Sequence, residues 1–566
     1  MNRAYNSSIM GNKSCRQCQS NFTVRPEDLA LYAKLGDPKN NLPVTPPTLC
    51  PDCRHIRRLT YRNDRVFYNR KCDKTRQEFV SIYAPDKPYT VYHPDAWWSD
   101  DWDPLDYGRD FDFNRPFFEQ FAELQKKVPL LGIHIVNCEN SYFCNYCGDD
   151  KSCYLDIAGE ANEDCYFNLF TKYSKDCCDT TFAYHSTLCY ETIQAYNGYN
   201  LNYSMHCDDT ADSSFCYDLK GSKNCLFSAN LRQKEYHIFN KALSKEEYNK
   251  KLTELDFGSY SKNQQALKQW TEFRKKNAIY RNAYLLNCEN SSGNNLKNCK
   301  NTHYSFNATN CEDCKYLFDV LDAKDCQDMN YSLYNPEIAY EIISTLQSRY
   351  SAFLTGGSTY NNNSYYCDSI QSCSEIFGCV ALRHKKYCIL NKQYSKKEYF
   401  ALKKRIIEHM KETNEWGEFF PSKLSPWGYN ETVANEYFPL TKKEALKNEF
   451  SWYDNPHEPP QKPQTYDIPD HIKDIPDSII DELLTCVECA KNFRIIKQEL
   501  KYYRKKNLPI PRECPDCRHR SRIELRPPRC LFERKCSKCQ NKISSPLAPS
   551  KPEKVYCEPC YLESLY

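Results

Sequence analysis

Cysteines paired as Cys-x-x-Cys near both ends of the chain constrain its fold more strongly than any other feature. The C-terminal region holds four such pairs, which are Cys486 with Cys489, Cys514 with Cys517, Cys536 with Cys539, and Cys557 with Cys560. Structural zinc takes four soft ligands in a tetrahedron, and two Cys-x-x-Cys turns supply four thiolates. Such a site is closed and lacks the open coordination position of catalytic zinc. The spacing therefore predicts two structural zinc sites in this region.

The N-terminal region repeats the first of these sites. Cys15 and Cys18 pair with Cys50 and Cys53, and the second pair of both regions reads Cys-Pro-Asp-Cys-Arg-His. The expected cofactor is therefore zinc, with three ions held by twelve cysteines. The shared motif also indicates that the two terminal modules are divergent copies of one another.

A second N-terminal site survives only as a remnant. When the two regions are aligned on the shared motif, Cys72 lies opposite Cys536 and His93 lies opposite Cys557, and no other ligand position holds a cysteine. Two ligands cannot close a tetrahedral site, so we expect this zinc to be lost. A metal kept by Cys72 and His93 is the alternative. The local fold is expected to be held by an aromatic cluster: Tyr89, Tyr92, Trp97, Trp98 and Trp102.

The sequence around the first site of each region resembles a known family. A Phe follows the first cysteine pair at Phe22 and Phe493, a Tyr-rich stretch comes next, and the segment closes with Pro-x-x-Cys-Pro-x-Cys-Arg. Over residues 15–54 and 486–518 this pattern is similar to the probable zinc-ribbon domain of treble-clef type. The resemblance implies zinc binding and no particular activity. We recognise no family in the rest of the chain.

The centre of the chain is a second duplication. Both copies begin with Asn-Cys-Glu-Asn, at residues 137–140 and 287–290, and their cysteines recur at intervals of about six, nine or twelve residues. Short alternating segments with regular turns predict a solenoid, most simply a right-handed β-helix. Cysteine behaves as a small apolar residue, so core ladders are the favoured role of the central cysteines. The alternatives are a metal-storage surface, a thiol redox array, or a metal site at Cys144/Cys147 or Cys311/Cys314.

Helix-start signals follow each central copy. Ser244 and Ser395 both begin a Ser-Lys-x-Glu-Tyr string, which predicts helices over roughly 245–276 and 396–412.

The expected fold class of the whole chain is α+β, β-rich and multidomain. Terminal zinc-ribbon modules of treble-clef type are expected to flank two cysteine-rich right-handed β-helix-like solenoids with trailing helices. The predicted domains are 12–110 (zinc module with a degenerate second site), 134–243 (first solenoid), 244–283 (helical connection), 284–394 (second solenoid), 395–415 (helix), 416–480 (Pro-rich linker) and 481–566 (double zinc module).

Arginines cluster beside the cysteine pairs. Zinc modules with basic and aromatic side chains commonly bind nucleic acid, because phosphates attract the charges and bases stack on the rings. The alternatives are a solvated basic face, or pairing of the arginines with the acidic stretch 95–112. The candidate nucleic-acid contacts are Arg54, Arg57, Arg58, Arg62, Arg65, Arg518, Arg520, Arg522 and Arg526.

The remaining sequence features exclude several classes of protein and assign no activity. The net charge is only +3, no apolar run could span a membrane, and the first residues lack an apolar leader, so a cytoplasmic protein is expected. No phosphate-binding, dinucleotide or metalloprotease motif occurs, and we expect no catalytic residues. A β-helix enzyme acting on carbohydrate would need clustered carboxylates, with Asp149, Asp150, Asp164, Asp176 and Asp179 as candidates by residue type.

These observations favour a non-catalytic zinc-binding protein that binds RNA, DNA or a ribonucleoprotein, or acts as a scaffold. A protein-interaction or metal-handling scaffold is the alternative, and a carbohydrate-active enzyme is the third possibility.

Overall fold

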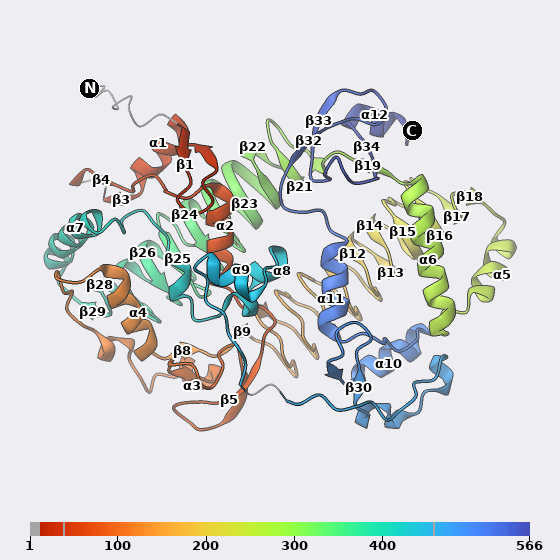
Figure 1. The fold of residues 1–566 in the computed structure, drawn as a ribbon, viewed down its shortest axis with the longest axis horizontal. Coiled ribbons are helices and arrows are strands. Elements are labelled where there is room, and N and C mark those ends of the chain that lie inside the picture. Colours follow the sequence, from red (N-terminus) through yellow and green to blue (C-terminus); the bar gives the residue numbers. More distant parts are fainter. Residues whose placement is uncertain (1–11, 38–39, 335, 457–458, 566) are drawn as a thin grey trace. The chain divides into compact units, whose positions relative to one another are not determined.

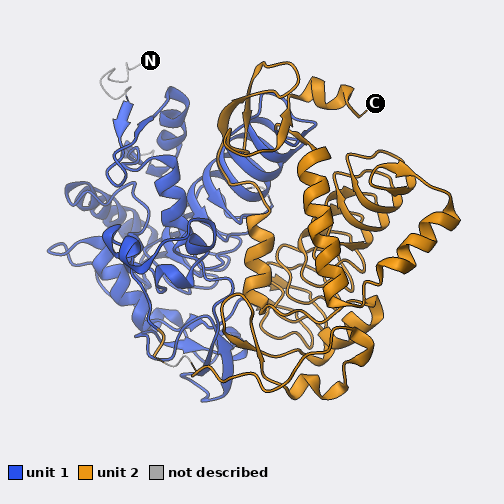
Figure 2. Cartoon of the chain, turned by 45° about the vertical axis from the view of Figure 1, so that its right-hand side comes forward, with its two compact units in different colours: residues 1–134, 283–454 blue, residues 135–282, 455–566 orange. Residues whose placement is uncertain are grey.

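The chain folds into two compact units, each built from two separate stretches of sequence. The computed structural model describes residues 12–37, 40–334, 336–456 and 459–565. Unit 1 contains residues 1–134 and 283–454, and unit 2 contains residues 135–282 and 455–566 (Figure 2). The N-terminal module is therefore joined to the second central repeat, and the C-terminal module is joined to the first. Among the described residues, no helix is long and apolar enough to cross a membrane.

Each central repeat is a stack of parallel coils (Figure 1). The first coil stack spans residues 135–239. Each residue in one of its parallel β-bridges pairs with the residue twelve positions later, as in Glu139 with Lys151 and Lys151 with Glu163. In the second coil stack, residues 284–390, the step is mostly twelve, as in Gly293 with Ser305. Backbone hydrogen bonds join neighbouring coils along the whole stack. The predicted β-rich architecture with parallel repeats agrees with this arrangement, while its right-handed sense stays a prediction.

A left-handed backbone conformation recurs at every third residue and forms the corners of each coil. In the first coil stack φ is positive from Asn137 (53°) through Asn140 (48°) and Phe143 (55°) to Phe239 (50°). Non-glycine residues rarely adopt this conformation, and Asn and Asp do so most easily. Side-chain hydrogen bonds between corners of successive coils stabilise it. Asn298 Nδ2 donates to Asn310 Oδ1 at 3.0 Å, and Asn310 Nδ2 donates to Asp322 Oδ1 at 2.8 Å.

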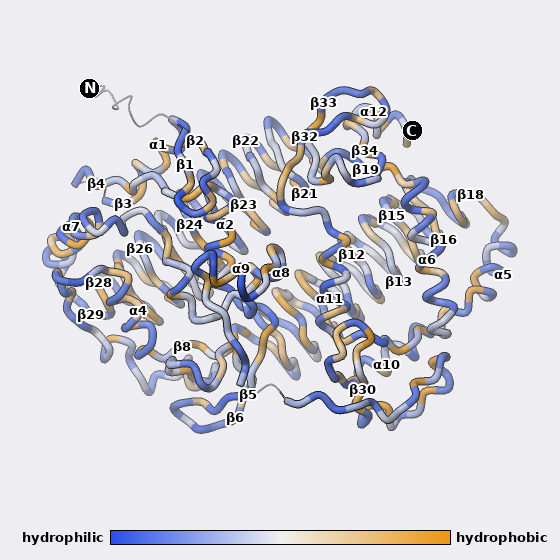
Figure 3. The backbone as a smooth tube through the Cα atoms, in the orientation of Figure 1, coloured by the Kyte–Doolittle hydropathy of each residue, from blue (hydrophilic) through white to orange (hydrophobic). Residues whose placement is uncertain are grey.

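The residue after each corner points into the stack. These inward positions hold almost all central cysteines, and Cys178 is the exception. Cys165, Cys177 and Cys189 are fully buried at twelve-residue intervals. Figure 3 shows hydrophobic and hydrophilic segments along the coils of both stacks. In each stack the buried inward cysteines lie in one apolar cluster, where the predicted core ladders would place them.

The strands of the first coil stack are short and mostly parallel. They are β9 (Ile135–Val136), β10 (Cys147–Gly148), β11 (Thr181–Tyr184), β12 (Ile193–Tyr196), β13 (Tyr199–Asn202), β14 (Met205–Asp208), β15 (Ala211–Tyr217), β16 (Lys223–Ala229), β17 (Glu235–Ile238) and β18 (Lys241–Ala242). An antiparallel pair, β17 with β18, closes the end of the stack.

The second coil stack repeats this plan. Its strands are β20 (Leu285–Leu286), β21 (Gly293–Lys297), β22 (Lys300–His303), β23 (Ser305–Asn330, which runs through successive coils), β24 (Glu337–Ile343), β25 (Ala352–Thr355), β26 (Asn362–Asp368), β27 (Ser374–Phe377), β28 (Lys386–Ile389) and β29 (Lys392–Gln393). The antiparallel pair β28 with β29 closes it in the same way.

Helices follow both stacks at the predicted positions. Unit 2 has α5 (Lys245–Leu255) and α6 (Tyr260–Asn277), and unit 1 has α7 (Lys396–Glu412). The hydroxyls of Ser244 and Ser395 accept the N–H groups of Glu247 and Glu398, and these glutamates complete capping boxes. Both predicted helix starts are confirmed.

The terminal modules consist of short hairpins and helices. The N-terminal elements are β1 (Asn12–Ser14), β2 (Asn21–Thr23), α1 (Pro26–Lys34), β3 (Gly36–Asp37), β4 (Leu42–Pro43), α2 (Pro51–Leu59), β5 (Tyr68–Lys71), β6 (Glu78–Ser81), β7 (Val91–Tyr92), α3 (Pro94–Trp98), α4 (Phe117–Lys127) and β8 (Leu130–Leu131). The C-terminal elements are β30 (Leu484–Thr485), β31 (Asn492–Phe493), α10 (Lys497–Lys506), α11 (Pro515–Glu524), β32 (Phe532–Lys535), β33 (Lys542–Ser545), β34 (Lys554–Tyr556) and α12 (Glu558–Glu563), with β34 paired to β19 (Ile279–Arg281).

The first part of the predicted linker is folded. Residues 416–454 belong to unit 1 and contain α8 (Val433–Tyr437) and α9 (Lys442–Lys447). Trp416, Phe420 and Trp427 are buried there, and the Trp427 indole N–H donates to the Ile82 carbonyl at 2.8 Å. The longest described stretch of the predicted linker without regular secondary structure is 459–469.

Candidate metal centres and the arginine clamps

Three clusters of four cysteines have the geometry of metal centres. Their members are Cys15, Cys18, Cys50 and Cys53, then Cys486, Cys489, Cys514 and Cys517, and finally Cys536, Cys539, Cys557 and Cys560. Within each cluster all sulfurs lie within 4.8 Å of one another. The sulfur pairs Cys18/Cys50, Cys489/Cys514 and Cys539/Cys557 are 3.6, 3.7 and 3.6 Å apart. A tetrahedron with metal–sulfur bonds of about 2.3 Å places its sulfurs about 3.8 Å apart. Each cluster could therefore hold one metal ion.

Local backbone structure prepares each cluster to bind. The first cysteine pair of each site sits in a tight turn whose last residue has positive φ, at Gln19 (61°), Ala490 (59°) and Gln540 (64°). The second pair begins a helix, with Cys50, Cys514 and Cys557 at the N-caps of α2, α11 and α12. Helix N-termini and peptide N–H groups favour thiolates.

One thiol in each cluster is poised to ionise. Hydrogen bonding with Cys53 lowers the pKa of Cys50 to about 7. Burial opposes ionisation of Cys486 and Cys536, but N–H donors outweigh it and lower their pKa values to about 7 and about 6. Thiolates are the form that binds metal.

The degenerate N-terminal site keeps the fold of its C-terminal counterpart. The His93 backbone N–H donates to Cys72 Sγ at 3.3 Å, as the Cys557 N–H donates to Cys536 Sγ at 3.3 Å. His93 is also the N-cap of α3, where Cys557 is the N-cap of α12. Cys72 and His93 belong to no cluster of three or more ligand groups within the described residues. Four rings of the expected aromatic cluster pack together, with Trp97 and Trp102 centroids 6.1 Å apart and with Tyr92 and Trp98 beside them, whereas Tyr89 packs against Tyr83.

In unit 2, two arginines of α11 share one buried carboxylate of the first coil stack. Arg522 Nη1 donates to Asp179 Oδ1 at 2.8 Å, and Arg518 Nε lies 3.0 Å from Asp179 Oδ2. All three side chains are buried, and Asp179 occupies a coil corner with φ of 52°. Burial acts against the charge of Arg518, but the Asp179 carboxylate outweighs it and raises the guanidinium pKa. We call this arrangement an arginine clamp.

Unit 1 contains the same clamp. Arg54 and Arg58 of α2 share Asp328, with Arg54 Nη2 at 2.8 Å from Oδ2 and Arg58 Nη1 at 3.2 Å from Oδ1. Asp328 is likewise a coil corner, with φ of 56°. Both arginines follow Cys-Pro-Asp-Cys at the same positions as in unit 2.

In both units, another arginine near the clamp stacks on an aromatic ring of the coil stack. The Arg62 guanidinium carbon lies 4.0 Å from the centroid of Tyr331, and that of Arg526 lies 3.9 Å from the centroid of Phe182. Tyr331 and Phe182 are each one corner beyond the shared aspartate. Cation–π contacts of this kind contribute about 0.5–2 kcal/mol each, more when desolvated.

Further carboxyl groups contact the arginines of each module. Arg57 donates to Glu341 at 2.6 Å and to Glu418 at 2.8 Å in unit 1. In unit 2 Arg518 donates to Glu499 at 3.0 Å and Arg522 donates to Glu191 at 3.2 Å. Sequence reasoning missed these partners, since they lie far from the arginines in the chain. The stretch 95–112 pairs instead with lysines, as in Asp103 with Lys385.

The burial of these arginines corrects the expectation of a phosphate-binding face. Among the nine candidate nucleic-acid contacts, the six buried ones are Arg54, Arg57, Arg58, Arg62, Arg518 and Arg522. They are neither solvated nor paired with residues 95–112. Arg65 and Arg526 are half-buried, and Arg520 is exposed, with Nη2 donating to Cys517 Sγ at 3.1 Å.

The five aspartates considered for a carbohydrate enzyme do not gather into one cluster among the described residues. Asp179 belongs to the clamp, and Asp150 points into the coil stack. Asp149, Asp164 and Asp176 are corner residues that contact Asn137, Tyr166 and Lys505, respectively.

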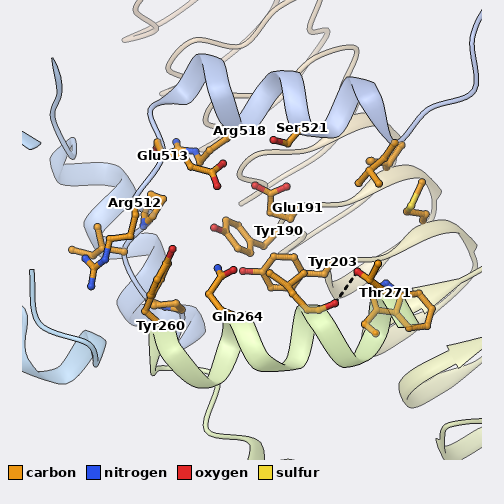
Figure 4. Close-up of a pocket in the computed structure, with 18 of the residues that line it drawn as sticks. Tyr190, Glu191, Tyr203, Tyr260, Gln264, Thr271, Arg512, Glu513, Arg518 and Ser521 are labelled. Atoms are coloured by element: carbon orange, nitrogen blue, oxygen red, sulfur yellow. Dashed lines mark hydrogen bonds between the residues drawn. The ribbon is translucent and has the colours of Figure 1, made fainter. Parts of the chain in front are cut away.

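Unit 2 also contains a pocket of about 240 Å³ beside its clamp (Figure 4). The rings of Tyr190, Tyr203, Tyr260 and Trp270 line it. Burial raises the pKa of Glu191 to about 8, and burial also raises the pKa of Glu513. The pocket thus combines aromatic walls with two carboxyl groups. Its walls come from the first coil stack, from α6, and from α11 with the segment before it.

Comparison with known proteins adds no functional assignment. No family model and no curated protein matches the sequence. Among solved structures the chain is similar to the "putative acetyltransferase from Desulfovibrio desulfuricans G20", with 10% identity, a TM-score of 0.11, and coverage of 44% of this chain and 63% of that one. A likeness at this level carries no argument.

Proposed function

We propose that this protein is a non-catalytic binding scaffold in which structural zinc holds two arginine-bearing helices against two solenoids. The observation that carries this proposal is the repeated clamp, in which Arg518/Arg522 grip Asp179 and Arg54/Arg58 grip Asp328. In each case the helix begins at a cysteine of a four-cysteine cluster. Metal binding therefore fixes the helix that carries the clamp.

Zinc is the ion that best suits these clusters. Four sulfurs in a tetrahedral spacing favour zinc over harder cations, and the closed ligand set leaves no position for substrate. Treble-clef zinc-ribbon modules remain our proposal for the local fold, supported by the cysteine-capped helices. The coil stacks are best understood as β-solenoids, as the twelve-residue step and the inward cysteines suggest.

A protein or small-molecule partner fits this scaffold better than nucleic acid does. Six arginines that would have supplied phosphate contacts neutralise buried carboxylates instead. The exposed Arg520, with the half-buried Arg65 and Arg526, would give little of the salt dependence expected of a phosphate-binding face. A cytoplasmic location also stays a prediction.

The experiment compares zinc dependence with nucleic-acid binding. Hydrogen exchange of the whole chain is measured before and after chelation, together with a salt titration against fluorescent RNA and DNA. The scaffold proposal expects exchange of α11 and the coil around Asp179 to rise when zinc is removed. Tight, salt-dependent nucleic-acid binding that is lost in Arg520→Ala, with unchanged exchange, would overturn it.

The pocket of unit 2 supports a second candidate function, binding of a small flat molecule that carries N–H donors. Aromatic rings favour a flat apolar body, and the Glu191 and Glu513 carboxyls accept hydrogen bonds.

Benzamidine is a suitable probe for this pocket, and saturation-transfer NMR measures its binding. Gln264→Trp, which fills the pocket, should abolish the signal. Gln265→Trp, at the neighbouring exposed position outside the pocket, should preserve it. Equal signals from both variants would exclude this site.

A further inference from the structure

One coil of the first stack carries carboxylates inside the stack. Its inward residues are Cys147, Asp150, Cys153 and Asp156, and all four are buried. The ligand atoms of Asp150, Cys153 and Asp156 lie within 4.8 Å of one another. None of the other described inward positions in the two stacks holds an acidic residue. This coil is thus chemically distinct from its neighbours.

The two carboxylates have less hydrogen bonding than their burial demands. The Asn162 N–H donates to Asp150 Oδ1 at 3.0 Å, and Asn162 Nδ2 donates to Asp156 Oδ2 at 2.8 Å. Asp150 Oδ2 and Asp156 Oδ1 have no hydrogen-bond partner, although both side chains are 0% exposed. Neither carboxylate forms an ion pair with a side chain among the described residues. A buried, unpaired carboxylate is costly unless a cation or a proton neutralises it.

The missing side chain of Gly159 leaves a space next to the unpaired Asp150 Oδ2 and next to Asp156 Oδ2, which accepts from Asn162 Nδ2. A Cβ atom at Gly159 would lie 2.6 Å from Asp156 Oδ2 and 2.8 Å from Asp150 Oδ2. Gly159 is the next inward residue after Asp156, and its φ lies outside the left-handed range, so backbone conformation does not require glycine there. The missing side chain therefore serves the space and not the turn.

The second coil stack supplies an internal comparison. Counted along the inward positions from the shared Asn-Cys-Glu-Asn, the residues opposite Asp150, Cys153, Asp156 and Gly159 are Cys299, Thr302, Ser305 and Ala308. The carboxylates and the space are thus both absent from the copy. The Thr302 hydroxyl donates to the Cys311 carbonyl at 3.0 Å, and Ala308 fills the glycine position.

We propose that Asp150, Cys153 and Asp156 hold a fourth metal ion, a divalent transition-metal cation such as zinc, inside the first coil stack beside Gly159. Two carboxylate oxygens and one thiolate suit a borderline ion, whereas calcium or magnesium would prefer oxygen ligands alone. Cys147, on the remaining side of the same coil, lies at the edge of this space, with the Gly159 N–H at 3.3 Å from its sulfur. The ion neutralises the two unpaired oxygens. It is independent of the three four-cysteine clusters and of the proposed scaffold role.

The test is metal content by native mass spectrometry of the full chain expressed in zinc-containing medium. The wild-type chain should carry four ions. Gly159→Ala, which places a methyl group in the space while keeping every ligand, should carry three, and so should the isosteric pair Asp150→Asn/Asp156→Asn. The control Cys299→Ser, in the second stack, should still carry four.

The outcome is decisive in either direction. Four ions in the wild type and three in Gly159→Ala support the internal site. Three ions in the wild type, or four in Gly159→Ala, overturn it. A far-ultraviolet circular dichroism spectrum identical to that of the wild type excludes unfolding as the cause of the loss. Fewer than three ions in the wild type would overturn the internal site and would also count against the cysteine clusters, and so against the proposed function.

Discussion

Asp179 lies between Arg518 and Arg522, and its two carboxylate oxygens contact one guanidinium each, at 3.0 and 2.8 Å. Asp328 holds the same relationship to Arg54 and Arg58. Isolated buried ion pairs add little net stability, but removal of one partner leaves an uncompensated buried charge. The clamp therefore makes each module dependent on one corner residue of a coil stack.

Asp179→Asn should destabilise unit 2 strongly. It leaves Arg518 and Arg522 buried without their shared anion, which costs about 3–5 kcal/mol in comparable sites. Urea unfolding, followed by probes in each unit, measures the change. Asp328→Asn should act equally on unit 1. Asp325→Asn, at the preceding, half-buried corner, is the matched control and should change stability by less than about 0.5 kcal/mol. Similar losses at Asp325 and Asp328 would contradict the clamp.

Substitution of one cysteine should change the metal content at the intact C-terminal site and not at the degenerate N-terminal site. Cys536→Ser removes a ligand of a closed cluster, so the chain should lose one ion. Cys72→Ser, at the matching N-terminal position, should lose none, because Cys72 accepts backbone hydrogen bonds from Thr75 and His93 and belongs to no ligand cluster in the described part of the chain. Elemental analysis of the two variants decides the point. Loss of an ion from Cys72→Ser would contradict this prediction and would support a metal held by Cys72 and His93.

Unit 2 should lose stability as pH rises. Burial raises the pKa of Glu191 from its usual 4.5 to about 8. Between these values the folded state keeps a proton that the unfolded chain has released, so the free energy of unfolding falls with increasing pH. One group contributes at most about 1.4 kcal/mol per pH unit. Glu191→Gln should flatten this slope in urea titrations between pH 5 and 8, whereas an unchanged slope would assign it to another group.

Central cysteines should tolerate small residues and reject large ones. Cys216 is fully buried on the inner side of the first stack, and its thiol lies 3.5 Å from the Cys225 carbonyl. Cys216→Leu should destabilise unit 2 by about 1–3 kcal/mol through overpacking. Cys216→Ser should cost less, because serine and threonine already occupy other inward positions and bond to carbonyls. Neither change should alter the metal content, and a lost ion would contradict a purely packing role.

Much of the local structure could be predicted from the sequence. The cysteine spacing located all three clusters, and the two Ser-Lys-x-Glu-Tyr strings located the starts of α5 and α7. These features depend on residues close together in the chain. The small inward cysteines could also be predicted, because their regular intervals match one coil.

The partners of the arginines could not be predicted in the same way. Arg522 and Asp179 are separated by 343 positions, and the sequence did not indicate that the N-terminal module joins the second repeat. A cluster of arginines next to zinc ligands looks the same whether it faces phosphate or a buried carboxylate. Aspartate at a coil corner is also expected for its backbone preference alone, which concealed the role of Asp179 and Asp328.

A double-mutant cycle between Arg522 and Asp179 measures whether the clamp couples α11 to the first coil stack. The free energy of unfolding of unit 2 is measured for Arg522→Met, for Asp179→Asn, and for both changes together. The clamp predicts that the double variant loses less stability than the sum of the single losses, by at least about 1.5 kcal/mol, because the second change removes a charge that the first left unpaired. Strictly additive losses would show that the two side chains do not depend on each other, and so that the clamp does not hold α11 to the stack.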